Sequence, residues 1–310
     1  TRMAMGGVKT MTRIEWTDES WNPVVGCTPV SPGCAHCYAQ TMALRLQAMG
    51  VRGYDGEIDD RGHWTGKINL IDEALEKPLH WREPRMVFVN SMSDLFHESV
   101  PFEFIDRVFA VMALCPQHTF QVLTKRPERM LSYLTRRERN RGFIGNPRGI
   151  GDPPEWAYKD PCDKVYSIVR QTQKHAPLTW PLPNVWLGVS CENQEQADKR
   201  ILILLECPAA VRFVSAEPLL ERIDFAYTCF NGADSFGTMP GIDWVICGGE
   251  SGPNARPMDE DWVRDIRDQC VSAGVAFFYK QKVERGRKIG LPELDGKVWS
   301  QFPGGREGEG

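Results

Sequence analysis

Three cysteines, Cys27, Cys34 and Cys37, fall within eleven residues of the chain, and closely spaced thiols can bind a metal. The segment around them, WNPVVGCTPVSPGCAHCYA, is rich in glycine, proline and serine, which predicts a loop. Such a loop lets several sulfur atoms converge on one ion or cluster, and thiolates favour soft or borderline metals. The spacing therefore predicts a metal centre at these residues.

The number of thiols separates two kinds of metal centre. A structural zinc site is closed by four ligands. His36 is the nearest candidate for a fourth ligand, but it directly precedes Cys37 and is poorly placed to complete the same tetrahedron. Three thiolates instead match a cluster that keeps one iron open. We therefore expect a cluster, with structural zinc and inert thiols as the alternatives.

The composition sets the background for this site. The chain has 310 residues, 42% of them hydrophobic, which is enough for a substantial buried core. Its formal net charge of -4 excludes a global basic surface for nucleic acid. No apolar run reaches the length of a membrane span and no leader is evident, so we expect a cytoplasmic protein without a membrane partner. Disulfides are rare there, and buried free thiols are expected at Cys115, Cys207, Cys247 and Cys270.

The elements that must position these residues follow a repeated form: a short apolar strand, a polar loop and a helix-like stretch. The form recurs in residues 86–98, 119–131, 185–207, 211–225 and 243–270. Near-continuous apolar strands that alternate with helices are typical of a parallel sheet covered by helices. With a strand near Val24 and Val25 and a last one at 275–281, about seven strands are expected, in an open or closed α/β barrel or a doubly wound sheet.

Polar side chains follow these strands at the points where each strand ends. In a parallel sheet the carboxyl ends of the strands meet at one edge, the mouth, so these side chains are expected to lie together. They are Asp94, Lys125, Arg126, Ser190, Glu192, Asn193, Glu217, Glu250, Lys280 and Gln281, with Gly248 and Gly249 in the segment CGGESGPNARP. A glycine-rich turn brings backbone NH groups close to an anion or a nucleoside, and a tight structural turn is the alternative.

One segment departs from the repeated form and interrupts the single domain expected at 13–285. Residues 136–184 are rich in glycine, proline and arginine without an evident strand, and we interpret them as an insertion that covers the mouth or docks a partner. Guanidinium groups bind phosphates and rings stack on bases, so a nucleic-acid strand suits this segment, with a solvated basic face as the alternative. The residues concerned are Arg136, Arg137, Arg139, Arg141 and Trp156. Residues 286–310 are expected to form a partly mobile tail.

The cysteine segment resembles the radical S-adenosylmethionine (radical SAM) superfamily, in which three cysteines after the first barrel strand hold a 4Fe–4S cluster. Tyr38 and the helical AQTMALRLQAM after it are similar to that superfamily's pattern, although six residues rather than the commonest three separate Cys27 from Cys34. Residues 13–282 resemble more closely a three-cysteine protein family of phages and bacteria that is grouped with radical SAM proteins by similarity. The motifs that carry this resemblance are IEWTDESWNPVVGCTPVSPGCAHCYA, VNSMSDLFH, LTKRPERM, GVSCENQ, SAEPLL and GGESGPNARPM.

The resemblance implies a fold and a mechanism. The fold would be a partial (β/α) barrel of the radical SAM type. Cys27, Cys34 and Cys37 would hold a 4Fe–4S cluster, and the amino and carboxylate groups of S-adenosylmethionine would bind the iron that lacks a thiolate. After reduction by a donor such as flavodoxin or ferredoxin, cleavage of the sulfonium bond would produce a 5′-deoxyadenosyl radical that takes a hydrogen atom from the substrate. A fourth thiolate would block this chemistry.

The resemblance also implies roles for residues after the second and third strands. Asp94 would contact the methionyl amine or the ribose of the cofactor, and a helix N-cap is the alternative. Lys125 and Arg126 would pair with the cofactor carboxylate or with a substrate phosphate. A solvated surface pair is the alternative for these two cations.

Similar roles are implied for residues after the later strands. Ser190, Glu192 and Asn193 would hold ribose hydroxyls, or they would cap the helix that begins there. Glu217 has the same two interpretations at its own strand end. Apart from the resemblance, the glycine-rich loop at 247–257 is itself expected to form part of the rim for cofactor or substrate, with a tight structural turn as the alternative.

The expected function is therefore radical-initiated modification or repair, with DNA or RNA as the leading substrate class. Two other functions stay open at this point. One is a zinc-stabilised, non-enzymatic nucleic-acid-binding protein, and the other is a radical enzyme that acts on a small metabolite.

Overall fold

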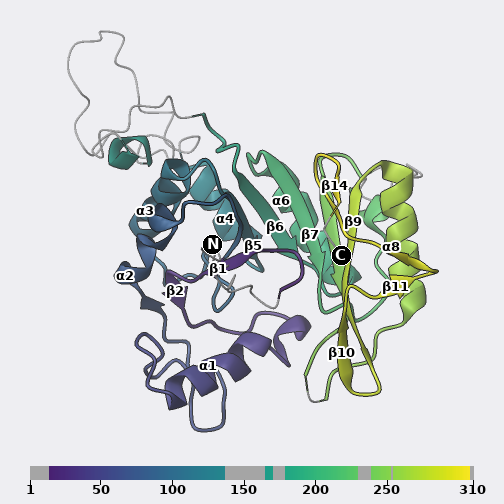
Figure 1. Ribbon diagram of the computed structural model, residues 1–310, viewed down its shortest axis with the longest axis horizontal. Helices are drawn as coiled ribbons and strands as arrows, with labels where there is room; N and C mark the ends of the chain where they lie inside the picture. Colours follow the sequence, from purple (N-terminus) through teal and green to yellow (C-terminus); the bar gives the residue numbers. More distant parts are fainter. Residues whose placement is uncertain (1–13, 137–164, 170–178, 230–238, 253, 308–310) are drawn as a thin grey trace, which may run out of the picture.

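A curled eight-stranded sheet forms the centre of the protein, and helices cover its outer face (Figure 1). The computed structural model describes residues 14–136, 165–169, 179–229, 239–252 and 254–307. The strands of the sheet, in spatial order, are β1 (Glu19–Trp21), β4 (Met86–Val89), β5 (Thr119–Thr124), β6 (Val185–Ser190), β7 (Val211–Ala216), β8 (Trp244–Gly248), β9 (Ala276–Glu284) and β10 (Arg287–Gly290). Neighbours are parallel except β9 and β10. The fold is therefore a mixed α/β half-barrel, which agrees with the predicted α/β class and partial barrel.

The helices connect consecutive strands of this sheet. They are α1 (Tyr38–Ala48), α2 (Asp72–Leu75), α3 (Phe102–Leu114), α4 (Pro127–Leu134), α6 (Gln194–Glu206), α7 (Phe225–Cys229) and α8 (Glu260–Ala273), with short 3-10 turns η1 (Pro32–Cys34) and η2 (Lys77–His80). Helix α3 is an example of how these helices pack. Its apolar residues recur at helical spacing, so that Ile105, Val108 and Met112 share one face, and all three are buried. Buried side chains of the helices other than α1 form the main hydrophobic core together with the outer face of the sheet.

Aromatic side chains fill the concave face of the half-barrel below the mouth. Trp16, Phe88, Phe213, Trp244 and Phe278 form one buried cluster. The ring centroids of Trp16 and Phe88 lie 4.7 Å apart, and those of Phe213 and Trp244 lie 5.7 Å apart. Trp16 and Phe88 also line the pocket at the mouth, so the pocket has an apolar floor.

The first strand of the sheet differs from the predicted one. The sheet begins with β1, whereas Val24 and Val25 form β2, which pairs with β3 (Asn69–Leu70) in a separate antiparallel ribbon. Pro23 accounts for the break after β1, because proline has no NH group to donate to a continuing ladder. The chain rejoins the parallel arrangement at Gly26, which forms a bridge with Ser93 beyond the end of β4.

The segment predicted as a tail after residue 285 instead extends the fold. Strand β10 pairs with β9, and two hairpins follow: β11 (Glu293–Leu294) with β12 (Lys297–Val298), and β13 (Gln301–Phe302) with β14 (Arg306–Glu307). The ring centroid of Phe302 lies 5.1 Å from that of Trp244, and the Trp244 indole donates to the Gln301 carbonyl (2.8 Å). Burial of the aromatic cluster therefore holds this segment in place.

Part of the predicted insertion at 136–184 also packs on the fold. Residues 165–169 are helical, and Val165 and Val169 are buried in the main core. Residues 137–164 and 170–178 lie outside the described residues. In the described part of the chain, no helix combines the length and the apolar character needed to cross a membrane.

Candidate functional site

A pocket of about 540 Å³ opens at the mouth of the half-barrel, where the carboxyl ends of the strands meet. All three predicted metal ligands line it: Cys27 follows β2, Cys34 ends η1, and Cys37 is the N-cap of α1. Its volume lies within the range of typical cofactor and ligand sites. The structure thus brings the three cysteines to one cavity at the predicted edge of the sheet.

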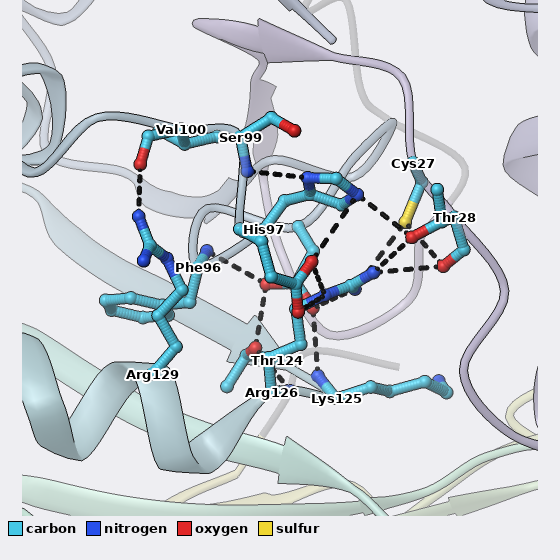
Figure 2. Close-up of polar contacts among 12 residues, drawn as sticks. Cys27, Thr28, Phe96, His97, Ser99, Val100, Thr124, Lys125, Arg126 and Arg129 are labelled. Carbon is cyan, nitrogen blue, oxygen red and sulfur yellow. Dashed lines mark hydrogen bonds and ion pairs between the residues drawn. The ribbon is translucent and has the colours of Figure 1, made fainter. Parts of the chain in front are cut away.

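The loop that carries the cysteines, residues 26–37 (the cysteine loop), is held by three arginine–carboxylate pairs from other parts of the mouth. The first pair joins Arg126, which follows β5, to Asp94, which follows β4 (Figure 2). Arg126 is only 5% exposed, and its Nη1 lies 3.2 Å from Asp94 Oδ2 while its Nε lies 3.1 Å from both carboxylate oxygens of Glu98. Its Nη2 donates to the carbonyl oxygen (3.1 Å) and hydroxyl (2.7 Å) of Thr28 in the cysteine loop.

Asp94 organises the ends of β4 and β5 through both of its oxygens. Oδ1 accepts hydrogen bonds from the Phe96 amide (3.0 Å) and the Thr124 hydroxyl (2.7 Å). Oδ2 accepts from the Lys125 amide (3.1 Å) and from Arg126. The hydrogen bond from the Phe96 amide closes a local turn, as expected if Asp94 caps a helical turn. With four donors from the chain itself, the buried Asp94 carboxylate positions Arg126.

The second pair joins Glu192, after β6, to Arg200 on α6. The Glu192 side chain is fully buried, and its carboxylate accepts from Arg200 Nη1 (3.0 Å) and from the amide of Gly33 in the cysteine loop (3.0 Å). A β-carbon at Gly33 would lie 2.9 Å from the Glu192 carboxylate carbon, so only glycine allows this approach. Burial alone would raise the pKa of Glu192, but the Ser31 hydroxyl, the charges of Arg200 and Lys125 and the Gly33 amide outweigh it, and the pKa is lowered.

The third pair joins Glu250, after β8, to Arg256. Glu250 Oε1 lies 2.5 Å from Arg256 Nη2, and Oε2 accepts from the Arg256 backbone amide (2.9 Å). Both partners reach the cysteine loop, because Glu250 Oε2 lies 2.7 Å from His36 Nδ1 and Arg256 Nη1 donates to the Pro32 carbonyl (3.0 Å). Burial acts to raise the pKa of Glu250, but the hydrogen bonds from Arg256 and His36 outweigh it and lower the pKa to about 2.

This shift makes stability depend on acid pH in a defined direction. Because the folded-state pKa of about 2 lies below the ordinary value of 4.5, the stabilisation by Glu250 is complete above about pH 4.5 and is lost as the pH falls toward 2. We expect the free energy of unfolding of Glu250→Gln to fall less steeply than that of the wild type across this range. Denaturant unfolding of the metal-free protein at several pH values measures the slope.

The matched control for this experiment is an exposed ion pair. Glu73 pairs with Arg52 at 2.8 Å, and both side chains are mostly exposed, so this contact contributes little to stability. Glu73→Gln should therefore show the wild-type slope. Identical slopes for all three proteins would contradict the role of the Glu250 pair.

Lysines and hydroxyls also line the pocket. Lys280 Nζ lies 3.1 Å from Glu217 Oε1, and the Ser215 hydroxyl donates to Glu217 Oε2 (3.2 Å). Lys288 pairs with Glu15, outside the lining, at 2.8 Å. The Lys125 side chain also lines the pocket, and among the described residues its ammonium group has no hydrogen-bond or ion-pair partner. A cation without a carboxylate partner at a pocket wall is available to an anionic ligand.

Most predicted cofactor-binding residues lie at this pocket, but their contacts differ from one another. Those that line it are Asp94, Lys125, Arg126, Ser190, Glu217, Gly249 and Glu250. Glu192 lies behind the cysteine loop, and Gly248 makes room for Glu217, whose Oε1 would lie 2.7 Å from a β-carbon there. Asn193 does not line the pocket; its side chain caps α6 by accepting from the Gln196 amide (3.0 Å). Of the two roles expected for Asn193, the structure therefore shows the helix cap.

The predicted phosphate contacts of the insertion lie mostly outside the described residues, which exclude Arg137, Arg139, Arg141 and Trp156. Arg136 is described, and its Nη2 donates to Asp106 Oδ1 (2.7 Å). Its guanidinium lies 4.7 Å from the ring centroid of Tyr133 and 5.2 Å from that of Phe102. Arg136 therefore packs against α3 and α4, which does not support a phosphate-binding role, because a carboxylate and two rings already surround its charge.

Sequence reasoning missed four residues in the contacts that hold the cysteine loop: Thr28 within the loop, and His97, Arg200 and Arg256 outside it. Thr28 directly follows the first cysteine, which was the one local signal. Arg200 and Arg256 lie eight and six residues after their glutamate partners. That separation does not identify a pair, because the bend of the chain between the partners is a tertiary feature.

The chemistry of the donors decides whether they fit the predicted cluster. Burial and the Asp94 carboxylate raise the pKa of Cys27 to about 12. A thiol binds a metal as the thiolate, so a bound metal would displace this proton. In the part of the chain described here, no three His, Cys, Asp or Glu side chains converge as ligands of a single ion would. Cluster thiolates each bind a separate iron. The three thiols line one pocket, so Cys27, Cys34 and Cys37 are the residues that would hold the expected cluster.

The remaining predictions about thiols can be checked directly. Cys115, Cys207, Cys247 and Cys270 are buried and form no disulfide, as expected from their apolar surroundings. Burial raises the pKa of Cys207 to about 12 and also raises that of Cys270. These thiols are therefore unreactive packing groups.

The fold and the site together define a class: an α/β half-barrel with a three-cysteine pocket at the carboxyl edge of its parallel strands. A family described as "Protein of unknown function (DUF5131)" matches residues 11–303, so the chain belongs to this family. Comparison with curated proteins and with solved structures gave no match.

Proposed function

We propose that the protein is a radical SAM-type enzyme that holds a 4Fe–4S cluster through Cys27, Cys34 and Cys37. One observation carries this proposal: these three cysteines, and no other cysteine of the described residues, line one pocket at the carboxyl edge of a half-barrel. When bound, the cluster and S-adenosylmethionine supply a 5′-deoxyadenosyl radical once an electron donor such as flavodoxin or ferredoxin has reduced the site. Three thiols leave one iron for the cofactor, which is the reason for the missing fourth ligand.

The chain's own residues position the cofactor and exclude water in this proposal. The free ammonium group of Lys125 suits the cofactor carboxylate, and the hydroxyl of Ser190 at the pocket wall suits a ribose hydroxyl. Trp16 and Phe88 form the apolar floor, which keeps water from a reactive intermediate. Glu217 and Lys280 also line the pocket as an ion pair, which suits polar groups of the substrate.

The proposed reaction is modification or repair of a substrate with an anionic part, with nucleic acid as the leading class. Lys125 follows β5, Lys280 lies within β9 and Lys288 lies within β10, and all three line the pocket. Lysine ammonium groups bind phosphates as point charges. Lys280 and Lys288 are paired with Glu217 and Glu15, as Arg136 is with Asp106, so the support for a phosphate-bearing substrate comes from Lys125.

The test is anaerobic purification and reconstitution, followed by analysis of iron, sulfide and zinc. We expect about four irons and four sulfides per chain, the content of one 4Fe–4S cluster. With dithionite and S-adenosylmethionine, the reconstituted protein should slowly release 5′-deoxyadenosine even without substrate. One zinc per chain with no iron would instead favour the zinc-stabilised binding protein, and a full cluster without cleavage would remove the enzymatic part of the proposal.

A further inference from the structure

Cys27 differs from the other two pocket cysteines because a cation lies against its sulfur. Arg126 Nη1 lies 3.8 Å from Cys27 Sγ, within hydrogen-bond range for sulfur (Figure 2). Among the described residues, no donor contacts the sulfur of Cys34 or Cys37. The electrostatic environment of the three thiols is therefore unequal.

All N–H groups of the Arg126 guanidinium make contacts within the protein, and these contacts fix its orientation. Arginine has five N–H bonds. The Nε–H donates to Glu98, the two Nη1 protons serve Asp94 and Cys27, and the two Nη2 protons serve the carbonyl and hydroxyl of Thr28. No donor remains for a cofactor carboxylate or a substrate phosphate. The predicted anion-binding role therefore falls to Lys125 rather than to Arg126.

A further contact holds Thr28, the loop residue that Arg126 binds. The Thr28 hydroxyl lies 2.9 Å from His97 Nε2, and His97 Nδ1 accepts from the Ser99 amide (3.1 Å). Because Nδ1 accepts, the neutral imidazole carries its proton on Nε2 and donates to Thr28. In Figure 2 a dashed line joins His97 to Thr28, and Cys27 lies beside Thr28. The cation therefore cannot move away from the sulfur without breaking several buried contacts.

A fixed positive charge at one thiolate ligand has a defined effect on a cluster. Reduction adds one electron, donated here by a flavodoxin- or ferredoxin-type protein, and makes the cluster more negative without breaking a bond in the protein. Hydrogen bonds and charges at the ligand sulfurs stabilise the reduced form and raise the reduction potential. The effect is strong where water is excluded, and Arg126 is almost fully buried.

We propose that Arg126 is a positioning residue that raises the reduction potential of the bound cluster through its contact with Cys27. This inference rests on the proposed function and adds a redox role to one of the three pairs around the cysteine loop. The Arg200 and Arg256 pairs hold the same loop at Gly33 and Pro32 but do not contact a cysteine sulfur.

Redox titration of the reconstituted cluster, followed by electron paramagnetic resonance, tests the proposal. In Arg126→Gln the ratio of reduced to oxidised cluster at a fixed solution potential should fall at least about tenfold, which is 59 mV for one electron. Arg256→Gln is the matched control, because it removes a loop contact of the same kind without approaching a sulfur. It should stay within about threefold of the wild type at equal iron content.

A second variant protects the test against misfolding. Arg126→Gln leaves Asp94 buried without its cation, whereas Asp94→Asn combined with Arg126→Gln removes both charges. The double variant should show a shift of the same sign but smaller, because loss of the Asp94 charge partly compensates. Wild-type potentials in both variants at full iron content would overturn the proposal. A wild-type protein that takes up no iron would instead overturn the proposed function itself, which iron analysis distinguishes from a failed redox role.

Discussion

Alanine in place of Cys27, Cys34 or Cys37, one at a time, is expected to abolish the brown absorbance of the reconstituted protein and to remove most of its bound iron. Each thiol lines the same pocket, and each would supply the only protein ligand of one iron. Loss of one thiolate leaves an iron with no protein ligand, so the intact cluster is not retained. Iron and sulfide content and the visible absorption spectrum measure the effect.

Two buried cysteines outside the pocket serve as controls for this experiment. Cys115 and Cys270 are both 1% exposed or less and belong to the main core. Cys115→Ala and Cys270→Ala should therefore keep the full iron content, with at most a small loss of stability from the missing sulfur atom. A complete cluster in Cys27→Ala would show that the six-residue spacing misassigns the first ligand.

The second large effect is expected at the buried pair of Glu192 and Arg200. Glu192→Leu leaves the Arg200 guanidinium buried without its carboxylate partner, and a loss of this kind costs about 3–5 kcal/mol in the free energy of unfolding. It also removes the acceptor of the Gly33 amide in the cysteine loop. We therefore expect both lower stability, measured by denaturant unfolding of the metal-free protein, and poor iron incorporation.

Combining Glu192→Leu with Arg200→Met separates these two consequences. Replacing both members of a buried ion pair by apolar residues is often nearly neutral for stability, so most of the loss should be recovered. Iron incorporation should stay low, because the Gly33 amide still lacks its acceptor. Full iron content in the double variant would mean that Glu192 acts through folding alone.

The same helix offers a control pair for this experiment. Glu195 and Lys199 form an ion pair on the exposed side of α6. Glu195→Leu should change the free energy of unfolding by no more than about 1 kcal/mol, because exposed pairs contribute little. It should also leave iron incorporation at the wild-type level.

Local features of the sequence were sufficient to predict the outline of the fold and the position of the site. The apolar runs that became β4 to β9, with helical stretches between most of them, predicted a parallel α/β sheet because strands buried on both faces must be almost entirely apolar. Ser190 was correctly placed at a strand end and Asn193 at a helix start, since both depend on nearby residues. The glycines and prolines around Cys27, Cys34 and Cys37 predicted their loop for the same reason.

The first and last parts of the sheet could not be predicted in the same way. The three residues of β1 are too few for a recognisable pattern, and β10 becomes a strand by pairing with β9. Phe302 is held by contact with Trp244, which lies in a different strand. Such elements owe their structure to partners that are distant in the sequence.

The sequence by itself determined most of the residues that reach the mouth, whereas the tertiary structure decided what they do there. Asp94, Glu192 and Glu250 were expected to face a cofactor, yet each binds an arginine and supports the cysteine loop. The contacts join residues 98 to 224 positions apart, such as Arg126 to Thr28, Glu192 to Gly33 and Arg256 to Pro32. The physical reason is that a buried charge must find an opposite charge and hydrogen-bond donors, and only the folded chain brings those partners within reach.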